Sequence, residues 1–364
     1  MLATNINGTQ HDQTNQSGMT DSSLSTMIEF IRRLNLSYGI IIVFIAFFII
    51  LGNTLVLIVT WRERSLRQPS KYFIAFLAVA DLLVGVLVIP LRFYKLLLDI
   101  ESLRTMSIHL CRFLVWIDTF TLSTSIYTLT FISFDRYLKI SKPLQYKSRM
   151  TTSRSVKIIF LIVFISSSIA TYAATPFAGS SGILDGGVGP CRINNVNDLD
   201  KIKVFYTFFT IIAFMLPTIF IMIMYVLIFR IAHKRQKMFL NGELGEINNQ
   251  NRQGAFRQDL KVIKMLLLVV GVFICCWCPW IIIVFLSIYS SAFVVTSLNT
   301  FYFILIFGYA MRALPLLNSM CNPIIYACLD QTYREAFKRL FERIIHRPDS
   351  SRQQPPLALR PSRS

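Results

Sequence analysis

The sequence contains few charged residues and very few histidines. Of its 364 residues, 15% are charged and 54% are hydrophobic, whereas soluble domains carry about 25% charged residues. The four histidines are scattered, with no spacing that would bind zinc. The first residues are polar and lack the apolar core of a signal peptide, so none is expected. This composition predicts a membrane protein rather than a soluble enzyme.

Acidic residues are also scarce, since 37 Lys and Arg face 19 Asp and Glu, a net charge of +18. The basic residues cluster in particular loops and in the tail, without the arginine–aromatic patch expected of a nucleic-acid-binding fold. No nucleic acid partner is therefore predicted. Five of the seven cysteines lie in apolar runs and are expected to pack as small hydrophobic residues: Cys275, Cys276, Cys278, Cys321 and Cys328.

Long apolar runs are abundant. A helix needs about 20 mostly apolar residues to cross a bilayer, and seven stretches meet this need: 37–61, 71–95, 108–138, 155–177, 203–231, 260–288 and 300–327. No internal repeat of the kind found in transporters stands out. The sequence therefore predicts an all-α membrane protein, a seven-transmembrane helix bundle. A short amphipathic helix, residues 329–345, is expected to follow the seventh span on the inner leaflet.

The loops predict the orientation of the chain. Four segments are rich in Lys and Arg: 62–71, 139–157, 230–264 and 334–347. Basic loops of membrane proteins face the cytoplasm. This places the N-terminus outside and the C-terminus inside the plasma membrane. N-x-S/T sequons near the N-terminus agree with an extracellular, glycosylated segment: Asn7, Asn15 and Asn35. The expected division is an N-terminal segment 1–36, a bundle 37–328, the amphipathic helix, and a disordered tail 346–364.

Charged residues inside the apolar runs are the candidate functional groups, because charge is costly in a membrane. Asp118 lies within the third run, and Arg136 follows 18 residues later, five helical turns or about 27 Å along the same face. Two interpretations of Asp118 stay open. It is either a member of a structural ion pair, or the anionic contact for a cationic ligand in a cavity that opens outward.

A second acid, Asp81, lies in the second run. Three polar residues of other spans are candidates to converge on it: Ser125, Asn318 and Ser319. A carboxylate with hydroxyl and amide oxygens suits a small hard cation such as sodium, or a cluster of waters. No other metal or cofactor is predicted.

Prolines occur within three of the later spans, at Pro217, Pro279 and Pro323. Each removes a backbone hydrogen bond and can kink its helix. Kinks of this kind are tolerated where side chains or waters satisfy the freed carbonyl. The prolines therefore indicate either helix irregularities or hinges of a bundle that moves.

These features together resemble the rhodopsin-like (class A) G protein-coupled receptors, over residues 37 to 341. The resemblance lies in short motifs that appear in order, each on its proper span. They are GN at 52–53, LAVADLL at 77–83, Cys111 with DRY at 135–137, Pro217 with Tyr225, CWCP at 276–279, and NPIIY at 322–326.

The resemblance assigns roles to residues at the cytoplasmic end. Arg136 is expected to be held in the inactive state by Asp135 and by Asp259, and to be freed when the sixth span moves outward. The activation switch that the resemblance implies consists of Asp135, Arg136, Tyr137, Tyr225, Asp259, Asn322, Pro323 and Tyr326. A connector between ligand pocket and helix movement is expected at Ile126, Pro217 and Phe273. The resemblance also implies a disulfide between Cys111 and Cys191.

Asp118 matches the position at which biogenic amine receptors carry the carboxylate that binds a protonated amine, and STSIYTLTFISFDRYLKI looks most like histamine and muscarinic receptors. A charge-assisted contact in a dry pocket would anchor a small cationic ligand. The expected ligand-binding residues are Asp118, Leu122, Thr210, Trp277, Trp280, Ile281, Arg312 and Leu316.

The sequence departs from the amine-receptor pattern in several places. Ile281 stands where a second aromatic is usual, and Leu316 where a tyrosine is usual. Arg312, one turn above Leu316, would face the pocket, where it either neutralises Asp118 or serves as a second anchor for a zwitterion or an acidic group. A peptide or another small molecule is the alternative ligand, and a constitutively active orphan receptor is a further alternative.

Proteins of other classes fit less well. A channel or transporter would show repeats or pore-lining charges on several spans, and no catalytic cluster indicates an enzyme. The seventh span has no lysine for a retinal Schiff base. The partners implied are a heterotrimeric G protein, arrestin, receptor kinases, the lipid bilayer and a small cationic ligand.

Overall fold

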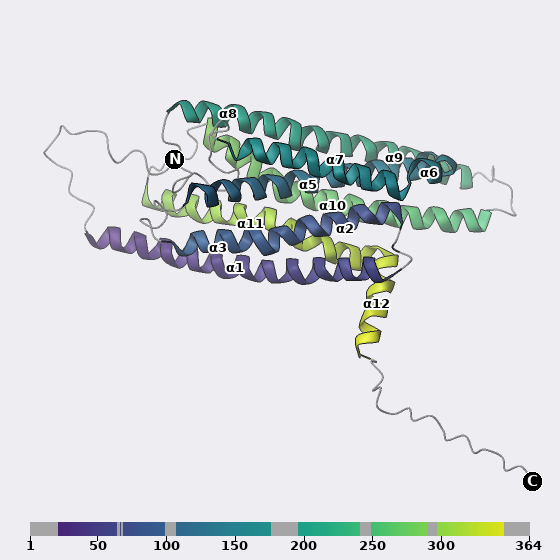
Figure 1. Ribbon diagram of the computed structural model, residues 1–364, viewed down its shortest axis with the longest axis horizontal. Coiled ribbons are helices and arrows are strands. Elements are labelled where there is room, and N and C mark those ends of the chain that lie inside the picture. Colours follow the sequence, from purple (N-terminus) through teal and green to yellow (C-terminus); the bar gives the residue numbers. More distant parts are fainter. Residues whose placement is uncertain are drawn as a thin grey trace, which may run out of the picture.

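The computed structural model describes residues 21–63, 66, 68–98, 107–175, 196–240, 249–289 and 297–345 (Figure 1). Every regular element in these residues is a helix, and the long helices run side by side as one bundle. The elements are α1 (Asp21–Arg62), α2 (Pro69–Leu83), η2 (Val84–Val88), α3 (Ile89–Leu97), α5 (Ile108–Ser141), α6 (Pro143–Arg149), α7 (Thr152–Ala173), α8 (Val196–Phe209), η5 (Thr210–Met215), α9 (Leu216–Leu240), α10 (Asn249–Tyr289), α11 (Leu298–Leu329) and α12 (Gln331–Ile345).

Each of the seven predicted apolar stretches is occupied by helix, so the predicted helix bundle is confirmed. The first helix is longer than its apolar run. It begins at Asp21, whereas the run begins at 37. The second and fifth stretches each consist of two α-helices joined by a wider π-helical turn, α2–η2–α3 and α8–η5–α9.

Six of the described helical segments are long and apolar enough to cross a membrane: Ser25–Arg62, Pro69–Leu97, Thr152–Ala173, Lys203–Lys234, Ile263–Leu286 and Leu298–Leu329. The remaining predicted span, α5, is more polar and carries many hydroxyl groups. Several of these hydroxyls donate to a carbonyl one turn earlier: Thr121 to Ile117 O at 2.9 Å, Thr128 to Thr124 O at 2.6 Å, and Ser133 to Leu129 O at 2.9 Å. The helix thus satisfies some of its own hydroxyls, which lets a polar sequence lie within an apolar bundle. The hydroxyls of Thr119, Ser123 and Thr124 are buried without a hydrogen-bond partner among the described residues.

The two π-helical turns have a local cause. Each ends two residues before a proline, since η2 ends at Val88 before Pro90 and η5 ends at Met215 before Pro217. A proline ring collides with the carbonyl four residues earlier and offers no N–H to it, and a wider turn at that point relieves the collision. The wider turn also rotates the residues that follow it relative to those that precede it, in both spans.

Pro323 also leaves a backbone carbonyl of α11 without its helical hydrogen bond, and a side chain of α1 donates to that carbonyl. The carbonyl four residues before Pro323 is that of Ser319, and the Asn53 side-chain Nδ2 donates to it at 3.2 Å and to Ile49 O at 3.0 Å. The neighbouring Gly52 lies so close that an added Cβ would be 3.0 Å from the Pro323 ring. The GN motif therefore allows α1 to approach α11 closely and to satisfy its freed carbonyl.

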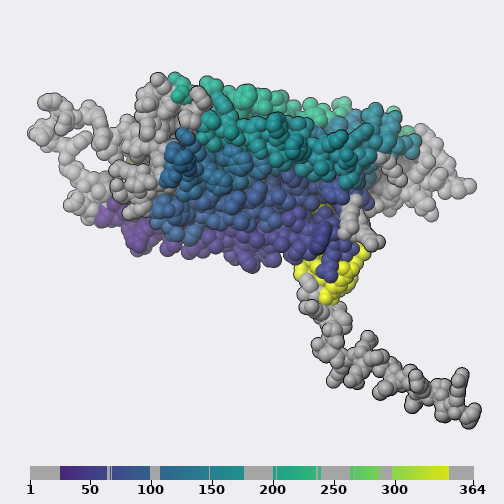
Figure 2. Space-filling view, viewed as in Figure 1, coloured from purple at the N-terminus to yellow at the C-terminus, as the bar shows by residue number. Residues whose placement is uncertain are grey.

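At its C-terminal end the bundle turns into α12, which leaves the bundle direction and lies against the ends of α1 and α2 (Figures 1 and 2). Asp330 begins this turn, because its carboxylate accepts from the N–H groups of Thr332 at 2.9 Å and Tyr333 at 3.2 Å, as a helix cap. The same carboxylate forms a buried ion pair with Lys71 of α2, and the Lys71 ammonium lies 4.7 Å from the Tyr333 ring centre. The helix predicted at 329–345 is thus fixed to the bundle by charge as well as by apolar packing.

Candidate ligand site and activation switch

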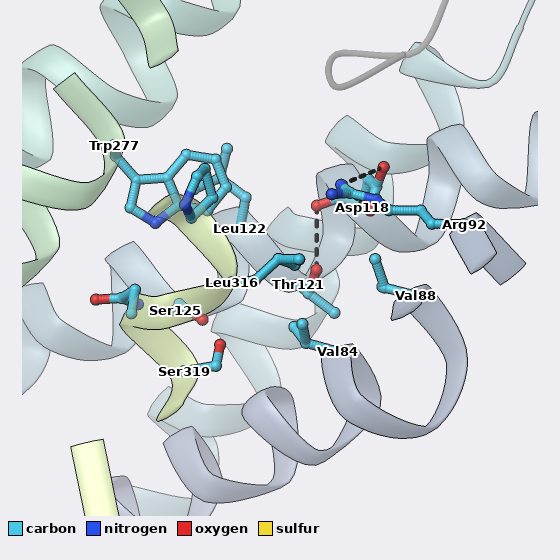
Figure 3. A pocket seen from close by; sticks show the side chains of 12 residues that line it. Val84, Val88, Arg92, Asp118, Thr121, Leu122, Ser125, Trp277, Leu316 and Ser319 are labelled. Atoms are coloured by element: carbon cyan, nitrogen blue, oxygen red, sulfur yellow. Dashed lines mark hydrogen bonds and ion pairs between the residues drawn. The ribbon is translucent and has the colours of Figure 1, made fainter. Parts of the chain in front are cut away.

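Asp118 lies on α5 inside the bundle, where its carboxylate forms an ion pair with Arg92 of α3 (Figure 3). One guanidinium nitrogen, Arg92 Nη2, donates to Oδ1 at 3.0 Å and to Oδ2 at 3.1 Å. Only 5% of the Asp118 side chain and 7% of the Arg92 side chain are exposed. In a pair this deeply buried, the attraction between the two charges offsets part of the cost of removing them from water.

A small cavity extends from this ion pair toward the centre of the bundle. Its volume of about 20 Å³ holds one water molecule or a dehydrated ion. The ion pair lies at one end, the Trp277 ring and Leu122 lie across from it, and Ser125 and Ser319 lie deeper (Figure 3). The lining residues are Val84, Val88, Arg92, Asp118, Thr121, Leu122, Ser125, Trp277, Pro315, Leu316, Asn318 and Ser319.

Of the two roles considered for Arg312, pairing with Asp118 is not seen in the structure. Asp118 is paired with Arg92, and the Arg312 guanidinium carbon instead lies 5.6 Å from the Tyr309 ring centre and 5.9 Å from that of Trp280. A cation over aromatic faces is stabilised by the ring quadrupoles. Arg312 does not neutralise Asp118 in this structure.

The other predicted ligand residues divide into two groups. Asp118, Leu122, Trp277 and Leu316 line the cavity together. Thr210, Trp280 and Ile281 do not line it. Thr210 is the first residue of η5, while Trp280 and Ile281 belong to the apolar packing of α10.

Arg92 is the site residue that sequence reasoning missed, although a signal was present. It stands 11 residues after Asp81, which is three turns of an ideal helix, so periodicity places both on about the same face. The wide turn η2 between them rotates that face, and this rotation cannot be read from hydropathy. A lone arginine in an apolar run is by itself a functional candidate.

Asp81 of α2 is fully buried inside the bundle, and it accepts a hydrogen bond from Asn322 Nδ2 at 2.8 Å. Its other oxygen, Oδ1, and the side-chain oxygen of Asn318 are buried without a hydrogen-bond partner among the described residues. Ser125 and Ser319 line the adjoining cavity. Unsatisfied oxygens of this kind fit a sodium ion or waters. No cluster of three or more His, Cys, Asp or Glu in the described part of the chain would suit a transition metal.

The predicted connector residues are all buried, and Ile126 and Phe273 belong to the main core cluster. Phe273 stacks on Phe214 with ring centres 5.8 Å apart, and lies 6.2 Å from the Trp277 ring centre. Phe214 was not predicted. It lies in η5, three residues before Pro217, so the wide turn caused by that proline positions it. Continuous aromatic packing therefore joins the cavity wall to the fifth span.

Near the C-terminal end of α5, Asp135 and Arg136 are both buried, with Arg136 Nε 3.7 Å from Asp135 Oδ2. Asp135 also accepts from the Tyr146 hydroxyl of α6 at 2.8 Å. Burial, followed by the charge of Asp135, raises the pKa of Tyr146 above its usual range, so this hydroxyl stays protonated and donates. Sequence reasoning missed Tyr146. Asp259, the second acid predicted here, lies in α10 but outside the residues whose side chains are described.

The remaining switch residues are located as follows. Asn322 and Pro323 lie in α11, where Asn322 donates to Asp81. Tyr326 is buried, and its ring stacks on Tyr333 of α12 with centres 5.9 Å apart. Tyr225 is buried in α9, while Tyr137 is partly buried beside the core. The described switch residues are thus gathered in the half of the bundle that contains Asp135 and Arg136.

Several extracellular predictions fall partly outside the described residues. Cys111 is disulfide-bonded, and the five cysteines of the apolar runs are free. Cys191, the predicted partner of Cys111, lies outside the described residues, as do Asn7 and Asn15. Asn35 lies within α1, where its Oδ1 accepts a hydrogen bond from the Tyr309 hydroxyl.

A seven-helix membrane bundle with a buried acid beside a central cavity and an Asp–Arg–Tyr triplet near one end of its third span defines a heptahelical receptor. Comparison with known proteins specifies the family. Residues 52–326 match the family described as 7 transmembrane receptor (rhodopsin family), so the chain belongs to the rhodopsin-like G protein-coupled receptors.

Three relatives illustrate the similarity. The chain is 29% identical to trace amine-associated receptor 1 of Homo sapiens over 313 residues, covering 83% of this chain and 86% of that one. It is 27% identical to trace amine-associated receptor 5 of Mus musculus over 308 residues, covering 82% and 83%. It is 29% identical to the D(1)-like dopamine receptor of Takifugu rubripes over 333 residues, covering 83% and 69%.

Proposed function

We propose that this receptor is activated by an extracellular ligand that carries a protonated amine, and that Asp118 is the anchor of that amine. The observation that carries the proposal is a carboxylate, 5% exposed, at the wall of a cavity inside the bundle. Such a carboxylate needs a cation, and in this structure a guanidinium already supplies one. A ligand ammonium can make the same charge-assisted hydrogen bonds.

The names of the relatives support an amine. Trace amine-associated and dopamine receptors are named for amines, and similarity to them covers more than four-fifths of this chain. The apolar residues of the cavity, Leu122, Trp277 and Leu316, would receive the non-polar part of the same ligand.

The packing supports a path from the ligand to the cytoplasm. Movement of Trp277 would be passed to Phe273 and Phe214, which are stacked on one another beside Pro217. We infer that α10 then moves away from α5, so that Arg136 is freed from Asp135 and contacts a heterotrimeric G protein. A ligand drives this change only by as much as it binds the open state more tightly than the closed state.

The rest of the proposal concerns partners and location. The receptor lies in the plasma membrane with its N-terminus outside, on the side where Asn7, Asn15 and Asn35 would be glycosylated. Arrestin and receptor kinases act on its cytoplasmic side. A sodium ion held by Asp81 would stabilise the closed bundle, because Asn318 and Ser319 of α11 would share it with α2. The ion would supply only charge neutralisation at that site.

The test is G protein activation in cells by a panel of biogenic amines, comparing wild type with Asp118→Ala. Asp200→Ala is the matched control, because it removes an acid whose side chain is 79% exposed in α8. The proposal predicts an amine response in wild type and in the control, and its loss in Asp118→Ala at equal surface expression. An equal response of Asp118→Ala would show that the amine binds elsewhere.

A further inference from the structure

Arg312 of α11 is a cation that lies against two aromatic rings. Its guanidinium carbon is 5.9 Å from the Trp280 ring centre and 5.6 Å from that of Tyr309. Aromatic faces attract the positive charge, but they are weak hydrogen-bond acceptors. Arg312 Nε is buried and has no hydrogen-bond partner among the described residues. The rings therefore stabilise the charge of this guanidinium, while a donor in its plane stays unused.

The position of Arg312 relative to the cavity follows from two neighbouring helices. Leu316 lines the cavity, and Arg312 precedes it by four residues, about 6 Å along α11. Trp277 also lines the cavity, and Trp280 follows it by three residues, about one turn of α10. Because α10 and α11 pack side by side as consecutive spans of opposite direction, both steps lead away from the cavity toward the same side. The contact between Arg312 and Trp280 agrees with this placement.

The first helix holds Tyr309, on which the guanidinium rests. The Tyr309 hydroxyl donates to Asn35 Oδ1, and the Tyr309 ring packs edge-to-face against Tyr38 with ring centres 4.9 Å apart. Tyr38 is itself buried in α1. A ring held through both its hydroxyl and its face has little freedom to move. The arginine beside it is thus positioned before a ligand arrives, and preorganised groups bind at a lower entropic cost.

The size of the cavity directs a ligand toward the same side chains. Its volume of about 20 Å³ is far below the several hundred Å³ of a ligand pocket. A ligand whose ammonium binds Asp118 therefore extends out of the cavity. One turn outward along α10 and α11 it meets Trp280 and Arg312.

We propose that Arg312, Trp280 and Tyr309 form a second subsite of this receptor, which binds a carboxylate of the ligand. The planar fork of a guanidinium matches the two oxygens of a carboxylate. The ligand then carries an ammonium at one end and a carboxylate at the other, and the apolar part between them faces Leu122 and Trp277. Arg312 contacts the ligand, and Tyr309 is a positioning residue. The proposal rests on the proposed function for the ammonium end of the ligand.

The first test measures G protein activation in cells by aromatic amines that carry a carboxylate on the far side of the ring. Each amine is compared with its carboxamide, which has nearly the same shape and no charge. We expect the carboxylates to be more potent on wild type by roughly 10- to 100-fold, the range for hydrogen bonds to a charged group. Carboxamides as potent as the carboxylates would overturn the proposal.

The second test exchanges the arginine. Arg312→Gln should abolish the advantage of the carboxylates and change the potency of the carboxamides by less than about threefold. Arg312→Lys keeps the charge without the fork, so it should keep only part of the advantage. Arg33→Gln is the matched control, because it removes an arginine of α1 whose side chain is 78% exposed. A purely structural role of Arg312 would lower the potency of both probes equally, and that result would contradict the proposal.

The third test concerns the support from α1. Tyr309→Phe keeps the ring and removes the hydroxyl that binds Asn35. It should reduce the advantage of the carboxylates by roughly 2- to 10-fold, as for a neutral hydrogen bond. Asn35→Ala should act in the same way. Because Asn35 also begins a glycosylation sequon, Ser37→Ala is the control that removes the sequon and keeps the Asn35 side chain. An unchanged advantage in both variants would refute the positioning role.

These tests separate the subsite from the proposed function. Equal potency of carboxylates and carboxamides, with both lost in Asp118→Ala, would refute the subsite and keep Asp118 as the amine anchor. A carboxylate preference that depends on Arg312 but survives in Asp118→Ala would keep the subsite and refute the anchor. No response of wild type at the cell surface to any probe would refute both. If Arg312→Gln does not reach the cell surface, the comparison of the two probes on wild type decides.

Discussion

The buried ion pair between Lys71 and Asp330 fixes α12 to the bundle, and we expect Lys71→Met to loosen that helix. The side chains are 9% and 3% exposed. Removing one member of such a pair costs about 3–5 kcal/mol. Asp330 would keep the two backbone N–H groups that it caps, of Thr332 and Tyr333, so the lower limit applies. About 3 kcal/mol corresponds to a rise of roughly 100-fold in the opening equilibrium of α12.

Hydrogen exchange of the amides in 331–345, measured on detergent-solubilised receptor, reports this opening directly. Lys338→Met is the matched control, since that lysine lies in α12 with 78% of its side chain exposed. It should change the exchange by less than about threefold, as surface substitutions do. The double variant Lys71→Met/Asp330→Asn should recover part of the loss because no buried charge is left unpaired. Unchanged exchange in Lys71→Met, or strictly additive effects in the double variant, would refute this reasoning.

Three further predictions concern other parts of the bundle. Asn53→Leu leaves the Ser319 carbonyl without its donor, and should destabilise the receptor by about 1–3 kcal/mol, seen as a lower thermal unfolding midpoint; an unchanged midpoint would contradict this. Tyr146→Phe removes the bond to Asp135 and should lower the midpoint equally from about pH 6 to 9, because the raised pKa keeps the hydroxyl protonated across that range; a loss that varied with pH would refute it. Sodium chloride, compared with N-methylglucamine chloride, should raise the thermal unfolding midpoint of wild type and leave that of Asp81→Asn unchanged. An equal effect of sodium on both proteins would refute the sodium site.

Much of the architecture was predictable because a membrane imposes it. The length of the apolar runs sets the spans, and the prolines mark where helices must deviate. The wide turns η2 and η5 precede Pro90 and Pro217, so their positions have a sequence signal. No sequence signal shows how these turns change the direction of the side chains that follow them. Charge within the apolar runs therefore identified Asp118 and Asp81, but nothing in the sequence identified Arg92 as the partner of Asp118.

Contacts between distant segments were harder to predict for a simpler reason. Lys71 and Asp330 are 259 residues apart, and Asn53 and Ser319 are 266 apart. The sequence around each of these residues does not predict its partner, because the pairing depends on which helices are neighbours in the bundle. The sequence left open whether Arg312 pairs with Asp118 for the same reason. Its position in the seventh span predicted that it faces the pocket. In the structure its guanidinium lies over the rings of Tyr309 and Trp280, and Arg92 forms the ion pair with Asp118.

The central claim is that occupation of Asp118 by a ligand ammonium activates a G protein. Its most direct test is ligand-dependent nucleotide exchange on a heterotrimeric G protein by purified receptor in lipid nanodiscs, with wild type and Asp118→Asn side by side. Asparagine keeps the size of the side chain and removes its charge. The account predicts exchange that depends on an amine-bearing ligand in wild type and is lost in Asp118→Asn. Equal ligand-dependent exchange by both proteins would contradict it.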